Sequence, residues 1–303
     1  MLIDTSFDVR TDAGGRDPDT YSPTLRRYHQ FLWSKPLPGG SLIELDTTTP
    51  HAYLHHRSEI GELWWSSDSV VTTFRDHGAA RSVVGQLAAE ELDEFLRAAY
   101  TIGAMLVFPG DKRGPSTTIN GARGLHPRIR DRIDLTLECI RRHYLGEPSP
   151  LADVLARYAD FFALFEDFRG YVDFFLLQDL VTDDGAAVRF FTPFADFTTP
   201  AIPPDVEVYR EYMRASIAFV EARNRRIAEW AAAQPASGDD VLADIVPLRP
   251  TTGAGVQRIL AEDAVGHMLR AGMMDDEIVA ELARQGIQVS IGAVAALRHR
   301  MGR

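Results

Sequence analysis

The stretch that most constrains the fold runs from residue 117 to 144, with the sequence TTINGARGLHPRIRDRIDLTLECIRRHY. A short polar loop over 118–124 leads into a segment whose apolar residues recur at helical spacing. Pro127 suits the first turn of that helix, where a missing N–H costs nothing. At about 100° per residue, one apolar arc is formed by Ile129, Ile133, Leu137, Ile140 and Tyr144. The sequence therefore predicts an amphipathic helix with one side against a core.

Three acidic residues fall on the opposite side of the predicted helix, within about 60° of one another: Asp131, Asp134 and Glu138. Three interpretations are open. Carboxylates one turn apart can hold Mg²⁺, or crowding of like charges can raise the pKa of one carboxyl and make it an acid/base catalyst. Alternatively, Arg130 with Asp134 and Glu138 with Arg142 form ordinary (i, i+4) ion pairs. The spacing alone favours the ion pairs, whereas Leu135 among these residues indicates partial burial.

The loop before the helix offers groups that bind anions. Its backbone N–H groups and the Arg123 guanidinium can hold a phosphate or a carboxylate, although the loop is neither a Walker A motif nor a dinucleotide fingerprint. The sequence identifies neither a metal nor a cofactor. The expected catalytic residues are Asp131, Asp134 and Glu138, and the expected substrate-binding residues are Asn120, Arg123 and Arg142.

Composition excludes several classes of protein. The formal net charge of -11 argues against a whole-surface polyanion binder, so any contact with nucleic acid needs a local patch. The chain has one cysteine, Cys139, which cannot form an intrachain disulfide and is better explained as a small buried residue than as a nucleophile. The N-terminus lacks a signal-peptide pattern, and no apolar run approaches about 18 residues. We therefore expect a cytoplasmic protein without a membrane span.

The remaining patterns predict an α+β domain over residues 1–233, with a small antiparallel sheet packed on a helical layer. Strands are expected at 41–45, 52–56, 62–66 and 102–108, and helices at 82–100, 151–168, 171–181 and 206–233. The 171–181 segment is apolar almost all round, which is typical of an enclosed helix. Gln178 and Asp179 at its end either tie the segment to its neighbours or face a ligand cavity. Residues 234–257 are rich in proline and glycine and read as a linker.

Four segments are similar, in the same order, to a widespread bacterial protein family of unknown function: PDTYSPTLRRYHQFLWSKPLPGG, YLHHRSEIGELWWSSDSV, TINGARGLHPRIRDRIDLTLECIRRHY and GYVDFFLLQDL. The resemblance covers residues 5–230. Members of that family often consist of this domain alone. The resemblance implies that the four segments belong to one domain and that the tail is an addition, but it implies no activity.

The tail, residues 258–303, has the pattern of three helices. The sequence AGMMDDEIVAELARQGIQVSIGAVAALRHRMGR resembles the helix-turn-helix of site-specific recombinases and sigma factors, with the last helix in the recognition position. After Glu281 the chain has basic residues and no acid, although the whole tail is close to neutral. The alternative is a three-helix bundle used for dimerisation or packing. The residues expected to contact DNA are Ser290, Gly292, Ala293, Arg298 and Arg300.

Two functions follow from these patterns. In the first, the main domain is an enzyme of nucleotide or nucleic-acid metabolism, of the toxin or defence type, fused to a DNA-binding helix-turn-helix. In the second, the main domain binds a small anionic ligand or a nucleotide without catalysis, and the tail reads an operator. A structural or dimerising protein without a DNA partner is the third interpretation.

Overall fold

The computed structural model describes residues 3–46, 54–58, 61–74, 77–110, 118–234, 274 and 277–280. The chain divides into two compact units, Leu2–Ala233 and Met1 with Gln234–Arg303. The elements and the site below belong to the first unit. The predicted linker beyond Gln234 and the predicted DNA-contacting residues (Ser290, Gly292, Ala293, Arg298 and Arg300) lie outside the described residues.

A three-stranded antiparallel sheet with the order β1-β2-β3 is formed by β1 (Leu54–Ser58), β2 (Gly61–Ser69) and β3 (Met105–Pro109). In the central strand β2, Trp65 lies opposite Leu54 of β1 and Pro109 of β3. Trp65 and Ser67 are buried and alternate with half-buried neighbours, because successive side chains of a strand point to opposite faces. Strand β3 is buried at every position, as its continuous apolar sequence requires.

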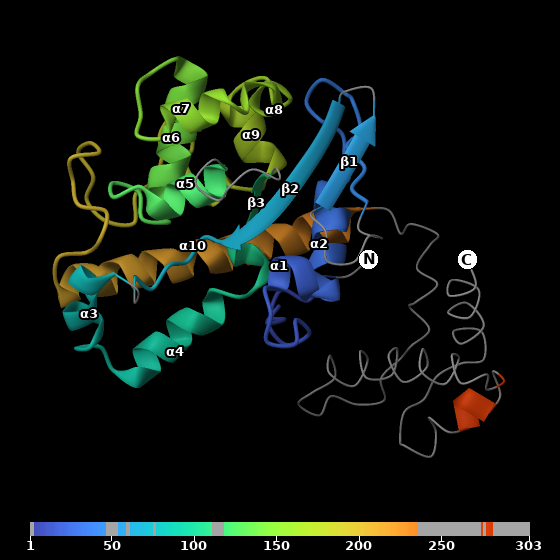
Figure 1. The fold of residues 1–303 in the computed structure, drawn as a ribbon, viewed down its shortest axis with the longest axis horizontal. Coiled ribbons are helices and arrows are strands. Elements are labelled where there is room, and N and C mark those ends of the chain that lie inside the picture. The colour runs from blue at the N-terminus through green and yellow to red at the C-terminus, as the bar shows by residue number, and fades with distance from the viewer. Residues whose placement is uncertain are drawn as a thin grey trace. The chain divides into compact units, whose positions relative to one another are not determined.

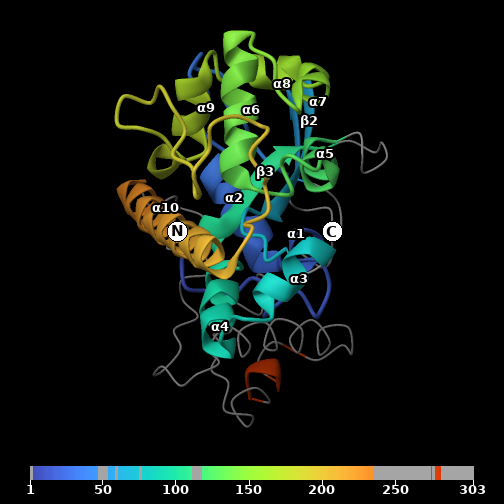
Figure 2. The same ribbon diagram turned by 90° about the vertical axis from the view of Figure 1, so that its left-hand side faces the viewer.

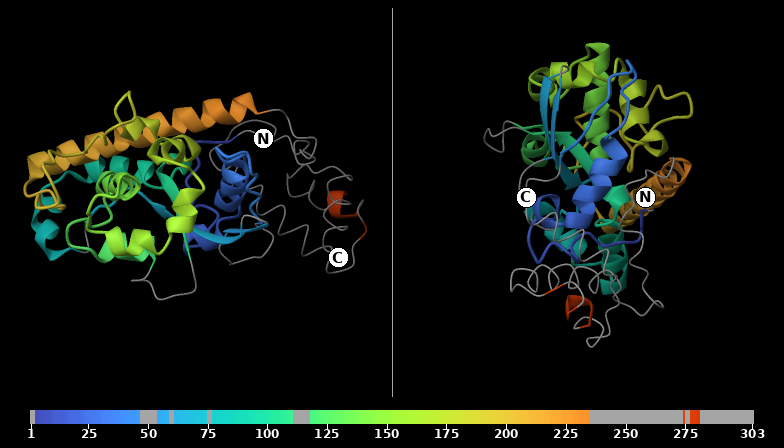
Figure 3. Two further views of the ribbon diagram at one scale, coloured as in Figure 1. Left: turned by 90° about the horizontal axis from the view of Figure 1, so that it is seen from above. Right: turned by 90° about the vertical axis from the view of Figure 1, so that its right-hand side faces the viewer.

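Helices surround this sheet, and α10 is the long one that crosses behind it in Figure 1 and lies along one side of the unit in Figure 3. Figure 2 shows α6 between α9 on one side and the α7–α8 pair on the other. None of the described helices has the length and apolar character to cross a membrane. The helical elements include α1 (Pro18–Tyr21), α2 (Pro23–Trp33), α3 (Gly78–Val84), α4 (Ala89–Ala98), η1 (Ile102–Ala104), α5 (Ile119–Leu125), α6 (Ile133–Leu145), α7 (Ala152–Ala156), α8 (Ala159–Ala163), α9 (Phe168–Phe174), η3 (Gln178–Leu180) and α10 (Val206–Ala233).

Aromatic rings form the centre of the core around Phe175. The guanidinium of Arg223, on α10, is fully buried beside them and donates hydrogen bonds to the carbonyl oxygens of Gly103 (2.8 Å), Met105 (2.9 Å) and Phe175 (3.1 Å). These bonds tie α10 to the sheet and to the end of α9. The rings whose centroids lie 4.9 to 5.9 Å from that of Phe175 include Trp33, Trp65, Phe165, Tyr171 and Phe174.

The predicted α+β class with a small antiparallel sheet is confirmed, but several elements differ from expectation. The strand predicted at 41–45 is wrong, because that segment makes only one isolated bridge, from Leu42 to Pro36, and Asp46 just after it makes another, to His55. The helices predicted at 82–100, 151–168 and 171–181 are each divided into two short elements. In the last case Leu176 adopts a left-handed conformation with a φ of 55°, which prevents one continuous helix.

Candidate functional site

The three carboxylates that the sequence placed on one helix face are bound to different arginines. Helix α6 begins at Ile133, so the prediction that it starts near Pro127 is wrong. Arg130 and Asp131 have φ values of 49° and 62°, and this left-handed turn separates Asp131 from the helix. The predicted pair of Arg130 with Asp134 is therefore absent, and Asp134 binds Arg132 instead.

Asp134 and Glu138 are buried carboxylates, and each forms ion pairs with its own arginine partners. Asp134 is fully buried and accepts hydrogen bonds from Arg132, with Nε at 3.1 Å from Oδ1, and from the backbone N–H of Phe191 at 2.9 Å. Glu138 accepts from Arg141 Nε at 2.8 Å and, as predicted, from Arg142 Nε at 2.7 Å. Burial tends to raise the pKa of Glu138, but the hydrogen bonds from both arginines outweigh it and hold the pKa below its ordinary value. Arg142 also donates to the carbonyl of Pro148.

Arg123 is enclosed by acceptors from β2, α5, the turn before α6 and α6 itself, where its Nε donates to the Thr136 hydroxyl at 3.3 Å. The predicted loop over 118–124 is largely helix α5, capped by the hydroxyl of Thr118, and Arg123 on this helix has no exposed surface. Its Nη1 atom lies 3.1 Å from Asp68 Oδ2 and 3.3 Å from both Asn120 Oδ1 and Asp131 Oδ1. The structure thus brings Asn120, Arg123 and Asp131 together and adds Asp68, which the sequence did not indicate. Asp134, Glu138 and Arg142 have other partners.

No metal site emerges from these carboxylates. Within the part of the chain that the structure describes, no group of three or more His, Cys, Asp or Glu side chains is placed to hold a metal ion. The lone cysteine, Cys139, is buried, and burial raises the pKa of its thiol to about 12. A thiol with that pKa is a poor nucleophile at neutral pH.

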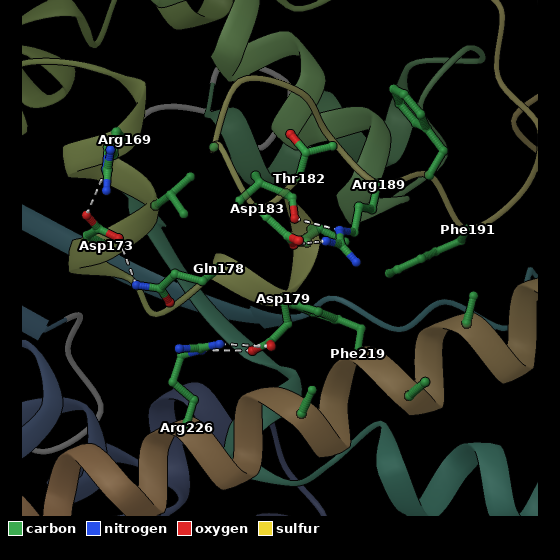
Figure 4. Close-up of a pocket in the computed structure, with 18 residues that line it drawn as sticks. Arg169, Asp173, Gln178, Asp179, Thr182, Asp183, Arg189, Phe191, Phe219 and Arg226 are labelled. Carbon is green, nitrogen blue, oxygen red and sulfur yellow. Dashed lines mark hydrogen bonds and ion pairs between the residues drawn. The ribbon is translucent and has the colours of Figure 1, made fainter.

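A large open groove lies elsewhere, between α9, η3, the 181–191 segment and α10 (Figure 4). Its volume is about 660 Å³, within the range of small-molecule sites. We call it the α10 groove, because three alanines of α10 form its floor: Ala215, Ala218 and Ala222. Their spacing of three and four residues places them on one face of the helix. Small side chains on that face leave room for a ligand against the helix.

The polar end of the α10 groove is built from interlocked side chains (Figure 4). Arg226, on α10, donates two hydrogen bonds of 2.9 Å to the carboxylate of Asp179, on η3. Gln178 Nε2 donates to Asp173 Oδ1 at 2.9 Å, while Gln178 Oε1 is buried and has no hydrogen-bond partner among the described residues. The sequence left open whether Gln178 and Asp179 tie the chain or face a cavity. They do both.

The other end of the α10 groove is aromatic. Phe190, Phe191 and Phe219 line it, and the rings of Phe191 and Phe219 lie 6.0 Å apart between centroids. The backbone of Phe191 is held by its hydrogen bond to Asp134. Asp134, which the sequence predicted to be catalytic, therefore supports the wall of the groove without lining it.

The roof of the α10 groove carries one arginine, Arg189, that the sequence did not indicate. Its Nε donates to the carbonyl of Val181 at 2.7 Å, and its guanidinium also pairs with Asp183. The local pattern that could have pointed to the groove is the row of small residues on α10 beside Phe219 and Arg226. Arg189 and Phe191 have no such local signal, because they reach the groove only through the tertiary fold.

Comparison with known proteins places the first unit in a family. Residues 3–227 match the sequence model of a family described as "Family of unknown function (DUF6994)". No curated protein and no solved structure matches the chain. The predicted resemblance of residues 5–230 to a family of unknown function is therefore confirmed, and the match ends before the tail.

Proposed function

Because the chain belongs to the DUF6994 family, whose function is not established, we propose a function from the geometry of the α10 groove. The first unit binds a small molecule in this groove, and the whole chain is a ligand-responsive DNA-binding regulator. The observation that carries the proposal is the groove itself, which combines an alanine floor, an aromatic end and fixed polar side chains. Sites for small molecules have this combination of apolar lining and a few oriented polar groups.

The enzymatic alternative has less support. Asp131, Asp134 and Glu138 are each paired with a different arginine. Acid/base catalysis by Asp134 would require a substrate to displace the buried Arg132 guanidinium, and breaking a buried ion pair is costly. Catalysis by Glu138 would require it to displace two arginines that hold this carboxylate. Their positions fit a structural role, and in the case of Asp134 that role includes support of the groove.

Replacing Ala218 by tryptophan tests the groove. Ala218 is exposed on the floor, so the indole ring fills the groove without disturbing the core. Ligand-observed NMR with indole and indole-3-acetate should detect binding to the full chain, and Ala218→Trp should weaken it by about tenfold or more. Ala232→Trp is the matched control, since Ala232 is exposed on the same helix outside the groove. Absence of binding of every aromatic compound tested to the wild type, or equal effects of the two variants, would remove the proposal.

The DNA-binding part of the proposal rests on sequence. The basic residues after Glu281 give the last predicted helix a local positive charge in an otherwise acidic chain. We expect the full chain to retard duplex DNA in a gel shift at low salt. Arg298→Ala together with Arg300→Ala should weaken binding and lower the salt slope by about 2, because roughly 0.9 counterion is released per phosphate contact. Ala218→Trp, without ligand, should leave the shift unchanged. Failure to retard DNA at micromolar protein would reject DNA binding by the tail and favour its alternative role in dimerisation or packing.

A further inference from the structure

The chemical groups around the α10 groove also indicate the class of ligand, an inference that rests on the proposed function. The first group is Arg189. Its backbone N–H donates to the carbonyl of Leu180 at 2.9 Å, and its Nε donates to that of Val181 at 2.7 Å, so the guanidinium is oriented before any ligand arrives. Asp183, its ion-pair partner, has a side chain that is 98 % exposed. An exposed pair of this kind contributes little, and an anionic ligand can replace Asp183 at low cost.

The second group is the aromatic and alanine surface. Phe219, on α10, lines the groove next to the alanine face with 5 % of its surface exposed, and Phe191 lies next to it (Figure 4). Flat rings prefer offset or edge-to-face contacts with such residues. The alanines allow a planar group to lie close against the helix backbone. This part of the groove therefore fits a planar ring better than a branched aliphatic chain.

The third group is the polar end. The Asp179 carboxylate accepts hydrogen bonds, and the Arg226 guanidinium beside it donates them. Gln178 adds an amide whose Oε1 atom is buried without a hydrogen bond, which is unusual in a folded protein. Rotation of this amide toward the groove would let a ligand N–H satisfy that oxygen. A ring whose edge carries both N–H donors and acceptors matches this end.

We propose that the α10 groove binds a heteroaromatic anion, of which a nucleoside monophosphate is the natural form. The phosphate binds Arg189, the base lies on Phe219 and the alanine floor, and the base edge meets Asp179 and Gln178. Arginine suits this role because its planar guanidinium matches the oxygens of a phosphate. The roof of the groove carries one arginine, Arg189, so we expect the ligand to carry one phosphate group.

Isothermal titration calorimetry of the full chain tests this with the four ribonucleoside monophosphates, their nucleosides and inorganic phosphate. At least one monophosphate should bind about tenfold more tightly than its nucleoside, and inorganic phosphate alone should bind more weakly than that monophosphate. Arg189→Gln should reduce the affinity for the monophosphate to that for the nucleoside, while nucleoside binding stays unchanged and reports that the groove is intact. The control is Arg225→Gln, an exposed arginine of α10 that does not line the groove, which should change neither affinity.

The outcomes separate this inference from the proposed function. If monophosphates bind no better than nucleosides, or if Arg189→Gln keeps the preference for the monophosphate, the inference of a heteroaromatic anion as ligand is wrong. If indole and indole-3-acetate bind the groove while no nucleoside or monophosphate does, the groove remains a ligand site but the inferred class is overturned. If indole and indole-3-acetate also fail to bind, the proposed function is wrong as well.

Discussion

Asp134→Asn should destabilise the first unit by about 3–5 kcal/mol, the cost of breaking a buried ion pair by removing one partner. Arg132 and Asp134 are 2 % and 0 % exposed, so the guanidinium left behind has no solvent to compensate it. Asparagine has the size of aspartate, but its NH₂ group must face either Arg132 or the N–H of Phe191, both of which are donors. Urea denaturation followed by circular dichroism measures the loss. Asp153→Asn, an exposed acid in the first turn of α7, should change stability by less than about 0.5 kcal/mol.

A double variant tests whether the lost stability comes from the unpaired buried charge or from the loss of the ion pair itself. Arg132→Met with Asp134→Leu removes both charges and should recover much of the stability lost in Asp134→Asn, because a buried ion pair can often be replaced by apolar residues. The double variant also removes the acceptor of the Phe191 N–H, so it should bind indole in the α10 groove more weakly than the wild type. Wild-type stability of the single variant would contradict the assignment of Asp134 as a structural anchor.

The sequence predicted long regular elements well and short ones poorly. Helix α10 was expected at 206–233 and is found at Val206–Ala233, because its apolar stripe repeats over many turns. The predicted start of α6 was wrong by about six residues, because the local sequence pattern does not indicate the left-handed turn at Arg130 and Asp131. That turn depends on contacts from α5, where Asp131 N–H donates to the carbonyl of Arg123 at 3.1 Å.

The candidate site could not be predicted from periodicity. The charged side of α6 was expected to face a ligand, yet Asp134, Leu135 and Glu138 are all buried. A helical pattern shows which side is polar, but the group that covers that side comes from elsewhere in the chain. The N–H of Phe191, which binds Asp134, lies 57 residues further along. The α10 groove likewise joins α9, η3, the 181–191 segment and α10, so it exists only in the folded chain.

Gly170→Ala gives the clearest case in which tertiary contacts reverse a local preference. Gly170 lies within α9, where alanine normally stabilises a helix by about 0.5–1 kcal/mol relative to glycine. A Cβ atom at this position, however, would lie 2.1 Å from the carbonyl oxygen of Phe165, a backbone atom that cannot rotate away. The backbone of Gly170 is also fixed, since its N–H donates to the Asp167 side chain at 2.8 Å.

We therefore expect Gly170→Ala to destabilise the unit by about 3 kcal/mol, at the upper end of typical overpacking costs. Gly78→Ala is the matched control, because no atom lies within 4 Å of the Cβ it would add at the start of α3. The control should be neutral or slightly stabilising, and urea denaturation of both variants measures the difference. Equal effects of the two substitutions would contradict the assignment of Gly170 to the close approach between α9 and the Phe165 carbonyl.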